Sequence, residues 1–414
     1  MCQWLIATSD SWTRKPAYYS IINLRNKTAG WYPESQRIDA PEEGTKTMSE
    51  YSTAIVGTGD PDEGAGMAYY HGDAYEDLDE CNLVACVDVV PERAATFAAE
   101  YDLPEENAYE DYETMVTEVC PDIVSITVSP GLHAELVVGT ARTGIPDAIH
   151  CEKPMADAWG ESRLMAQECW RRDIQLTFNH QRRFGAAWQD AKTYLNDGTV
   201  GDLQRVETSP PNLFDWGTHA IDLCNYFTDD SPADWVLGNI DYHEERRIFD
   251  VHHEDQALAS WRYENGIYGL ASTGAGSDAV DAFTRLIGDG GTIEVNIQGR
   301  VGERYDAQAG RAGIGECHTL RVRRDGEDGW QERSYEDEWV EMTRRGIGDL
   351  ITALDDGREP QLSSRRALGG TEIIFGAYES ARRRGRIDFP LDIKDHPLET
   401  MVENGLINPM PPDQ

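Results

Sequence analysis

Lysine is scarce in this sequence. The chain contains six lysines against thirty-one arginines, and after Met48 only Lys153, Lys192 and Lys394 remain. Basic charge as a whole is low, because 75 acidic residues against 37 basic ones give a formal net charge of −38. Nucleic acids and anionic membranes are bound through clusters of basic side chains. The deficit therefore argues against both as partners.

Two other patterns are absent. Eight cysteines are scattered without a Cys-x-x-Cys pair, which argues against a disulfide framework and a structural zinc site and favours a reducing compartment. No run of 18 apolar residues exists, so the sequence predicts no membrane-spanning helix. We therefore expect a cytoplasmic protein without a metal site.

Residues 1–47 differ in composition from the rest. They contain 5 acidic and 6 basic residues, whereas the remaining chain contains 70 and 31. Charged residues such as Arg14 and Arg25 interrupt the apolar stretches, so the segment does not have the apolar core of a signal peptide. We expect the natural start to be Met48, with a disordered native arm as the alternative.

The acidic residues are spread over the whole body of the chain rather than gathered in a tail. In molar salt the Debye length falls to about 3 Å, so repulsion between such charges costs little while the charges keep the protein in solution. Together with the scarcity of lysine, this composition is typical of a haloarchaeal protein.

A short β-rich run, Tyr51–Val56, ends in Gly57-Thr58-Gly59. In a dinucleotide-binding fold the first glycine permits a tight turn, and the second lets the backbone approach the pyrophosphate at a helix N-terminus. We interpret these three residues as cofactor-binding, with a plain strand-to-loop turn as the alternative. An apparent insertion over 60–66 displaces the usual third glycine and leaves the other phosphate contacts open.

The run from Asn82 to Asp88 predicts a second buried strand with an acid at its end. An acid at that position can accept hydrogen bonds from the adenosine ribose hydroxyls. No arginine is adjacent to hold a 2′-phosphate, although Arg93 is near in sequence, so Asp88 favours NAD and leaves NADP open. The alternative is an N-cap for the helix that begins near Pro91.

Helical and strand-like patterns alternate through the rest of this half. The helical stretches are 91–101, 112–119 and a third that follows from the turn at 129–133 and runs through Arg142, and the strands are 123–128 and 148–151. Such alternation predicts a parallel, doubly wound sheet with its ligand at the C-terminal strand ends. Ser129, Pro130 and His133 follow one of these ends, and Glu152 and Lys153 follow another, so we include all five among the cofactor-binding residues.

Lys153 lies between Glu152 and Pro154, directly after the strand at 148–151. Lys153 is one of only three lysines after Met48, and it lies at the edge of the sheet where we expect cofactor and substrate to meet. The alternative is a surface lysine at a strand end.

In the second half, Asp215 and His219 are four residues apart, so on a helix their side chains share one face. An acid near a histidine orients the ring and raises its pKa, as in many general bases. We expect Asp215 to act on His219 in this way. The alternative is an Asp N-cap beside an incidental surface histidine.

Between residues 233 and 295 the sequence pattern predicts strands joined by turns. Glu264-Asn265-Gly266 and Gly288-Asp289-Gly290-Gly291 each separate two alternating runs, which predicts two hairpins. We expect a helix over 367–384, a solvated acidic loop over 325–338, and a loop or strand start rather than a metal cluster at 252–255. The predicted domains are a Rossmann domain over 48–178, an α+β domain with a large, mostly antiparallel open sheet over 179–392, and a tail over 393–414.

Over roughly 51–392 these motifs resemble the Gfo/Idh/MocA (glucose–fructose oxidoreductase/inositol dehydrogenase) family. The most specific pieces are Glu152-Lys153-Pro154, the segment from Asn179 to Arg183, and Leu213-x-Asp215-x-Gly217-x-His219-x-x-Asp222. The late run from Ala377 to Arg382 also looks like that family's last helix. The departure from the family pattern is the insertion after Gly59.

The resemblance implies a tightly held nicotinamide cofactor and hydride exchange with a sugar or cyclic polyol. It implies that Lys153 contacts the reacting hydroxyl, that His219 exchanges its proton and that Asp215 supports both. Glu152 would lie on the nicotinamide side, and Asn179, Arg183 and Asp222 would contact substrate or support those contacts. It also implies a homodimer or homotetramer formed through the C-terminal sheet.

The sequence is compatible with three functions. The leading one is an NAD(P)-dependent sugar or polyol dehydrogenase. An NAD-dependent glycosidase could use the same scaffold, and net release of NADH would separate the two. The third is a non-catalytic sensor of nucleotide and sugar, against which the joint presence of Lys153, Asp215 and His219 argues.

Overall fold

The computed structural model describes residues 50–60, 66–301 and 315–411, and for 299–301 it describes the backbone alone. The expectations for residues 1–47 and for most of the insertion after Gly59 lie outside the described residues. No helix in the described part of the chain is both long enough and apolar enough to cross a membrane.

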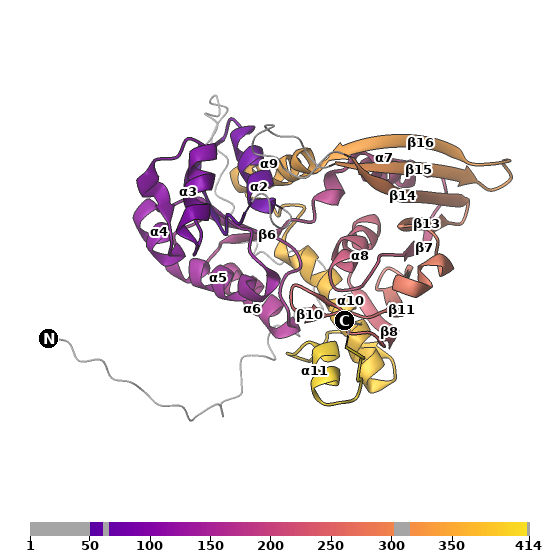
Figure 1. The fold of residues 1–414 in the computed structure, drawn as a ribbon. Helices are drawn as coiled ribbons and strands as arrows, with labels where there is room; N and C mark the ends of the chain where they lie inside the picture. The colour runs from indigo at the N-terminus through magenta and orange to yellow at the C-terminus, as the bar shows by residue number, and fades with distance from the viewer. Residues whose placement is uncertain (1–49, 61–65, 302–314, 412–414) are drawn as a thin grey trace. The chain divides into compact units, whose positions relative to one another are not determined.

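The first sheet is parallel and has the strand order β3-β2-β1-β4-β5-β6 (Figure 1). Its strands are β1 (Tyr51–Val56), β2 (Cys81–Val87), β3 (Ala108–Tyr109), β4 (Ile123–Ile126), β5 (Ala148–Cys151) and β6 (Gln175–Phe178). This order, with β1 at the centre and the chain crossing from one half to the other, is that of a dinucleotide-binding fold. The doubly wound parallel sheet predicted from the sequence is confirmed.

Helices cover both faces of this sheet because both faces of its strands are apolar. In β1, Ala54 and Val56 point to one core and Ile55 points to the other. The first core is closed by α4 (Tyr112–Val119), α5 (Pro130–Thr143) and α6 (Trp159–Trp170). The second is closed by α2 (Met67–Glu76), α3 (Pro91–Glu100) and α9 (Trp339–Asp356).

The second sheet is mostly antiparallel, with the order β16-β15-β14-β13-β7-β12-β11-β8-β17 and one parallel pair, β12 with β7. Its strands are β7 (Leu203–Thr208), β8 (Ala233–Asp241), β11 (Gln256–Tyr263), β12 (Tyr268–Ser272), β13 (Thr284–Gly288), β14 (Gly291–Val301), β15 (Gly315–Arg324), β16 (Gln331–Glu338) and β17 (Ile387–Asp388). A short ribbon of β9 (Arg247–Ile248) and β10 (Val251–His252) precedes β11. Both predicted hairpins are confirmed, since β11 pairs with β12 and β13 pairs with β14.

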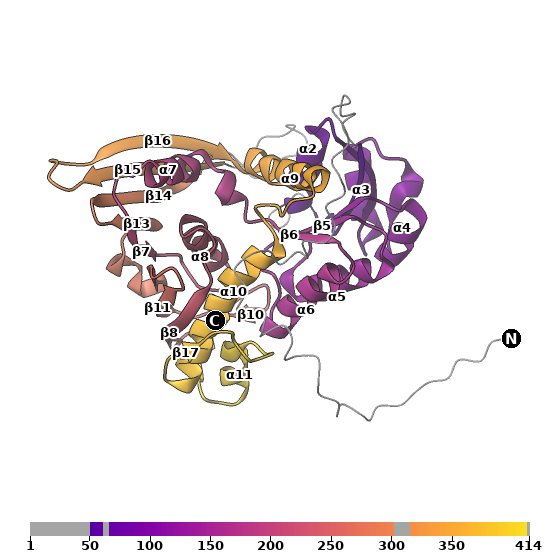
Figure 2. The ribbon, with the colours of Figure 1, turned by 180° about the vertical axis from the view of Figure 1, so that it is seen from behind.

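One face of the second sheet packs on helices and forms the largest core (Figure 2). The helices on this face are α7 (Ala186–Asn196), α8 (Trp216–Phe227) and α10 (Ser364–Arg383), and α11 (Pro397–Glu403) joins the same core by packing on α10 and β10. Short 3-10 turns occur at η2 (Glu105–Asn107), η3 (Gln181–Phe184) and η4 (Gly274–Ala279). The helix expected over 367–384 is therefore present as α10.

Two features differ from the sequence-based expectations or were not anticipated. The acidic stretch 325–338 is not all loop, because its second half forms β16, the outermost strand beside β15. Helix α9 follows β16 in the chain but packs on α2 of the nucleotide half, as both views of the ribbon show (Figures 1 and 2). The domain limits at 178 and 392 remain predictions.

Candidate active site

Lys153 and Asp215 meet at the C-terminal edge of the parallel sheet. Lys153 follows β5, Asp215 precedes α8, and Lys153 Nζ donates a hydrogen bond to Asp215 Oδ1 at 2.6 Å. The two side chains are 19% and 14% exposed, so the pair is largely withdrawn from water but still accessible. The peptide bond that follows, Lys153–Pro154, is cis. An ion pair in this setting fixes the position of the amine while leaving its other protons able to bind a substrate oxygen.

Asp215 therefore pairs with Lys153 instead of His219. The prediction that Asp215 orients the His219 ring and raises its pKa is wrong, because no hydrogen bond joins the two within the described residues. Asp215 occupies the N-cap position of α8 without capping through its side chain. Instead, Asn212 Oδ1 accepts hydrogen bonds from the backbone amides of Asp215 and Trp216 at 2.8 and 3.2 Å. The Asp215 carboxylate is thereby left to bind the amine 62 residues earlier in the chain.

His219 lies on α8, one turn beyond Asp215, and is buried with 4% exposure. It is thus not the surface histidine of the alternative interpretation. Burial lowers its pKa well below the usual 6.5, and the cations of Arg182 and Lys153 lower it further. Its Nδ1 has no hydrogen-bond partner among the described residues. The ring is a neutral imidazole on which the charge of Lys153 acts, and its Nδ1 is available to bind a ligand.

Glu152 is held in a buried polar network. His71 Nε2 on α2 lies 3.1 Å from Glu152 Oε1, and Asn179 Nδ2 donates to the same oxygen at 2.7 Å. Burial alone would raise the pKa of Glu152, but the hydrogen bonds and charge from His71 and the bond from Asn179 bring it to about 2. On its other side His71 Nδ1 lies 3.1 Å from Ser125 Oγ, so the network spans from α2 to the end of β4. The carboxylate is ionised and fixed in direction.

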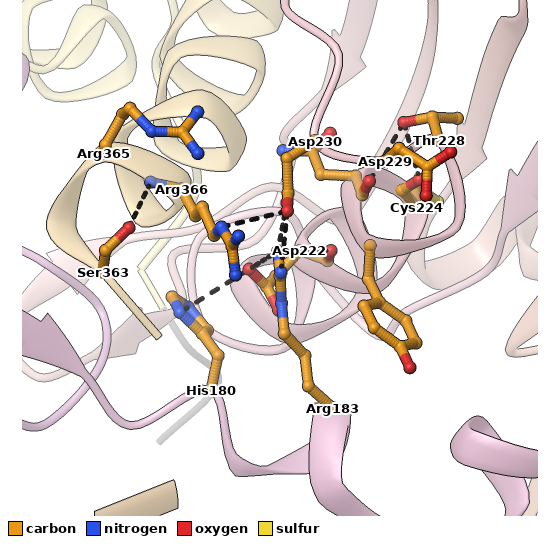
Figure 3. Close-up of polar contacts among 12 residues, drawn as sticks. His180, Arg183, Asp222, Cys224, Thr228, Asp229, Asp230, Ser363, Arg365 and Arg366 are labelled. Carbon is orange, nitrogen blue, oxygen red and sulfur yellow. Dashed lines mark hydrogen bonds and ion pairs between the residues drawn. The ribbon is translucent and has the colours of Figure 1, made fainter. Parts of the chain in front are cut away.

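Arg183 and Asp222 bind each other rather than facing outward. Arg183 is fully buried and donates from Nε and Nη2 to the two oxygens of Asp222 at 2.7 and 2.8 Å. Its Nη2 also donates to Asp230 at 2.8 Å, and Arg366 Nε lies 3.1 Å from the other oxygen of Asp230 (Figure 3). Burial would lower the pKa of Arg183, but the charges of Asp222 and Asp230 outweigh it and raise the pKa. The direct substrate contacts suggested for these two residues remain a prediction, while the structure gives both a structural partner.

The glycine loop follows β1 and is closed by Asp88. Asp88 Oδ2 accepts from the Gly59 amide at 2.9 Å and from Thr58 Oγ1 at 3.2 Å, and Oδ1 accepts from the Val90 amide. The N-cap residue of α3 is Val90, so the alternative of an Asp88 N-cap is wrong. The carboxylate lies at the tip of β2 against the loop, where a ribose is expected to lie.

Ser129, Pro130 and His133 sit at the start of α5. Ser129 is its exposed N-cap residue and Pro130 its first helical residue. His133 is fully buried, with Nδ1 2.9 Å from the Pro154 carbonyl oxygen and Nε2 3.0 Å from that of Val128. Both ring nitrogens are thus engaged by the backbone, and His133 joins the loop after β4 to the loop that carries Lys153.

The glycine loop fits a dinucleotide. Gly57 has φ +91°, and a Cβ on it would lie 2.3 Å from Val128 Cγ1, so only glycine is accommodated. Gly59 has φ +63°, but a Cβ on it would meet no atom of the described residues within 4 Å. The first glycine therefore makes a tight turn against the neighbouring strand end, and on the side of the second where a Cβ would lie no described atom blocks the approach of a ligand. That is the arrangement through which a pyrophosphate approaches the chain.

Several residues of the site have roles that the sequence does not predict. His71 belongs to no motif, and His180 lies within the segment from Asn179 to Arg183 without a role implied by the resemblance, while the partners of both residues are distant in sequence. Arg182 forms a buried bidentate pair with Glu316 of β15, with distances of 3.1 and 2.5 Å. The signal that could have found it was its position beside Arg183, since two adjacent arginines after an apolar strand need buried acids. In the described part of the chain no cluster of His, Cys, Asp or Glu has the arrangement of a metal site.

Two family models match the chain. A model described as "Oxidoreductase family, NAD-binding Rossmann fold" matches residues 51–180, and one described as "GFO/IDH/MocA C-terminal domain" matches residues 211–294. The two matched segments together make up about half of the chain, and they cover the glycine loop, the Lys153 loop and α8.

Known proteins align with this chain over different shares of its length. D-apiose dehydrogenase of Paraburkholderia graminis is 22% identical over 390 residues, covering 88% of this chain and 96% of its own. Myo-inositol 2-dehydrogenase of Thermotoga maritima is 24% identical, covering 48% of this chain and 63% of its own. The structure resembles an inositol dehydrogenase homologue of Azotobacter vinelandii, solved with NADH and myo-inositol, with a TM-score of 0.64, 17% identity, and coverage of 82% of this chain and 98% of the other.

Proposed function

The chain belongs to the Gfo/Idh/MocA family of oxidoreductases, and on that premise we propose that it transfers hydride between NAD and a secondary alcohol or hemiacetal carbon of a sugar or cyclic polyol. The relatives support this substrate class, since one is a D-apiose dehydrogenase and another a myo-inositol dehydrogenase.

The observation that carries the proposal is the Lys153–Asp215 ion pair beside His219. Three side chains from two distant segments come together at the strand end where the family binds its cofactor. A sensor that only bound sugar would need hydrogen-bonding groups but no positioned amine next to a neutral imidazole. This favours catalysis over a non-catalytic role.

The chemistry assigned to the chain's own groups is proton transfer. A hydroxyl must lose its proton as hydride leaves its carbon, and a neutral His219 can accept that proton. Lys153 donates a hydrogen bond to the same oxygen and stabilises the negative charge that develops on it. Asp215 holds the ammonium group in place through the 2.6 Å bond. General-base assistance of this kind contributes roughly 10²–10⁴-fold to the rate.

NAD, when bound, supplies the hydride acceptor. Gly57, Thr58 and Gly59 would hold its pyrophosphate, Asp88 its adenosine ribose, and Glu152 would lie on the nicotinamide side. The Asp88 carboxylate would repel a 2′-phosphate, so we propose NAD in preference to NADP. A kcat/KM for NADP equal to or above that for NAD would contradict this choice.

The test is a panel of aldoses, inositols and sugar nucleotides with NAD and NADP in molar KCl, followed by the absorbance of the reduced cofactor. We expect net NADH formation with at least one neutral sugar or polyol. Sugar release without net NADH would instead indicate the glycosidase. His219→Ala should lose at least about 10²-fold in kcat and keep NAD affinity, since its imidazole acts on the substrate proton. Loss of NAD binding in a folded His219→Ala protein would contradict its role.

We also propose that the protein assembles as a homodimer or homotetramer through the outer face of the second sheet. Leu237 of β8, Leu258 of β11 and Tyr268 of β12 are 48%, 48% and 49% exposed. The strand register puts all three on the same face, opposite the buried Ala257, Ala259 and Trp261. Leu237→Asp combined with Leu258→Asp should convert the assembly to monomer in light scattering. An unchanged mass would exclude this face.

A further inference from the structure

We propose that His180 is a specificity-determining residue that binds a second hydroxyl of the substrate, beside the hydroxyl whose proton passes to His219. The inference rests on the proposed function, because it deepens the description of the same site. It assigns a direct substrate contact to a residue outside the Lys153, Asp215 and His219 set.

The first observation is an unpartnered imidazole nitrogen next to the base. His180 is 4% exposed, and its Nε2 has no hydrogen-bond partner among the described residues. Its ring meets that of His219 edge to face, with centroids 5.7 Å apart. His219 Nδ1 is likewise without a partner in the described chain. Buried polar atoms in native proteins are nearly always hydrogen-bonded, so two such nitrogens on adjacent rings point to a ligand that supplies the missing groups.

The neighbours of His180 in sequence show the same pattern. Asn179 uses its Nδ2 to bind Glu152, but its Oδ1 has no partner among the described residues, and neither has Gln181 Oε1. The segment 179–181 therefore has three buried polar atoms that the described chain does not satisfy. A polyol, which has a hydroxyl on each carbon, is the class of molecule that can both donate to and accept from such a set.

The second observation is the ionic framework that holds the His180 ring. Asp222 Oδ1 lies 3.9 Å from His180 Nδ1, which is too far for a hydrogen bond but close enough to attract its proton (Figure 3). Asp222 is in turn fixed by Arg183, and Arg183 by Asp230, which Arg366 of α10 also contacts. The carboxylate favours the tautomer with its proton on Nδ1, which leaves a lone pair on Nε2. Nε2 is therefore set to accept a hydrogen bond from a hydroxyl.

The protonation state of the ring is consistent with this role. Burial lowers the pKa of His180, the charge of Asp222 raises it in part, and the cations of Arg183 and Lys153 lower it again. The ring is neutral near pH 7, so its affinity is for a hydroxyl and not for an anion. Arg183 and Arg366, the nearest guanidinium groups of this framework, are already paired with carboxylates.

The experiment compares parent and monodeoxy probes in the wild type and in His180→Phe, which keeps an aromatic ring and removes both nitrogens. The probes are myo-inositol with its monodeoxy analogues and D-glucose with 2-deoxy- and 3-deoxy-D-glucose, and the readouts are kcat/KM with NAD and calorimetric affinity for the NADH complex. We expect the wild type to prefer the parent over one deoxy analogue by about 2- to 12-fold, which is the value of one neutral hydrogen bond. In His180→Phe that preference should disappear, with the KM for NAD unchanged.

Two further variants make the result decisive. His180→Gln keeps a polar side chain and should restore part of the preference if His180→Phe folds poorly. His396→Phe is the matched control, because His396 is equally buried and has an unpartnered Nε2 in the described chain, but its Nδ1 caps α11. It should alter stability and leave the parent-to-deoxy ratio as in the wild type.

The outcomes separate this inference from the proposed function. A wild type that forms no NADH with any probe, yet binds a parent probe in a way that depends on His180, refutes the dehydrogenase activity and supports the contact. The inference would be overturned if His180→Phe lost kcat/KM or affinity equally for the parent and the deoxy probes. In that case the variant would still prefer the parent over the deoxy analogue.

Discussion

At the scale of single residues, the surroundings of His219 decide the pH range in which its imidazole can accept a proton. Burial, Arg182 and Lys153 all act in the same direction and lower its pKa well below 6.5. The neutral form is the one that accepts a proton, and it is therefore present through pH 6.5 and for some way below. A base of lower pKa is weaker, but it is ready to act over a wider range of pH.

We therefore expect kcat/KM to stay nearly constant as pH falls through 6.5, with an acidic limb that begins well below that value. Replacing Lys153 by Met removes one of the cations that depress the pKa of His219, so the acidic limb of the residual activity should move upward. Steady-state kinetics in buffers of matched ionic strength measure the acidic limb of the wild type and that of Lys153→Met. If the acidic limb of kcat/KM in the wild type began near pH 6.5, and if Lys153→Met did not move it, this account would be contradicted.

The residues of the candidate site were predictable from sequence, whereas their pairings were not. Lys153, Asp215 and His219 stood out through rarity, spacing and the family resemblance. The spacing of four suggested that Asp215 serves His219, but the carboxylate binds an amine from another segment. Sequence spacing reports neighbours on one helix, and a contact across 62 residues depends on how the two halves pack. For the same reason the contacts of His71 and His180 could not be predicted from the sequence.

At the scale of elements, the loop that carries Asp215 is anchored by Glu254, which lies two residues before β11. Glu254 Oε1 accepts from the Leu213 amide at 2.8 Å and from Thr273 Oγ1 at 2.9 Å, and Oε2 accepts from Tyr378 on α10 at 2.6 Å. Glu254 is buried, and that burial raises its pKa. One carboxyl group thus connects β11, β12, α10 and the loop before α8.

Glu254→Ala should leave the Leu213 amide without its partner and let the Asp215 loop shift. We expect a loss of about 1–3 kcal/mol in the free energy of unfolding and a fall of roughly tenfold or more in kcat, with the KM for NAD unchanged. Glu254→Gln retains an acceptor for the amide and should recover most of the kcat.

Tyr378→Phe is the matched control for that prediction. It removes the hydrogen bond to Oε2 but leaves the one from Leu213, so it should cost stability without lowering kcat. The readouts are thermal unfolding and steady-state kinetics on all three variants. Equal effects of Glu254→Ala and Tyr378→Phe on kcat would show that the carboxyl group does not act through the loop.

The elements themselves were largely predictable because their patterns are local. Alternating runs bounded by glycine turns gave the hairpins, and apolar strands between helical stretches gave the parallel sheet. Strand β16 was missed because its sequence, Gln331–Glu338, consists mostly of charged and polar residues, which suits an edge strand exposed to water. That it pairs with β15 depends on the partner strand, which a local pattern does not contain.

At the scale of the whole molecule, the charge is distributed unevenly between the site and the rest. Around the candidate site each described cation has a carboxylate partner, as in Lys153 with Asp215, Arg182 with Glu316 and Arg183 with Asp222. Residues 48–414 together, with the site included, have 70 acidic and 31 basic residues, so the excess of acid lies outside these paired groups. Like charges at this density repel one another, and the repulsion opposes the compact state.

Salt should then stabilise the fold by screening this repulsion. The Debye length shrinks from about 30 Å at 0.01 M to about 3 Å at 1 M, so we expect the thermal midpoint to rise steeply over that range of KCl and then level off. Far-UV circular dichroism and activity, each measured against KCl, follow the effect. An uncharged osmolyte at matched osmolality is the control, because it stabilises by exclusion and leaves the repulsion unscreened. The screening account requires KCl to act at concentrations where the osmolyte does not, and full stability in dilute buffer would refute it.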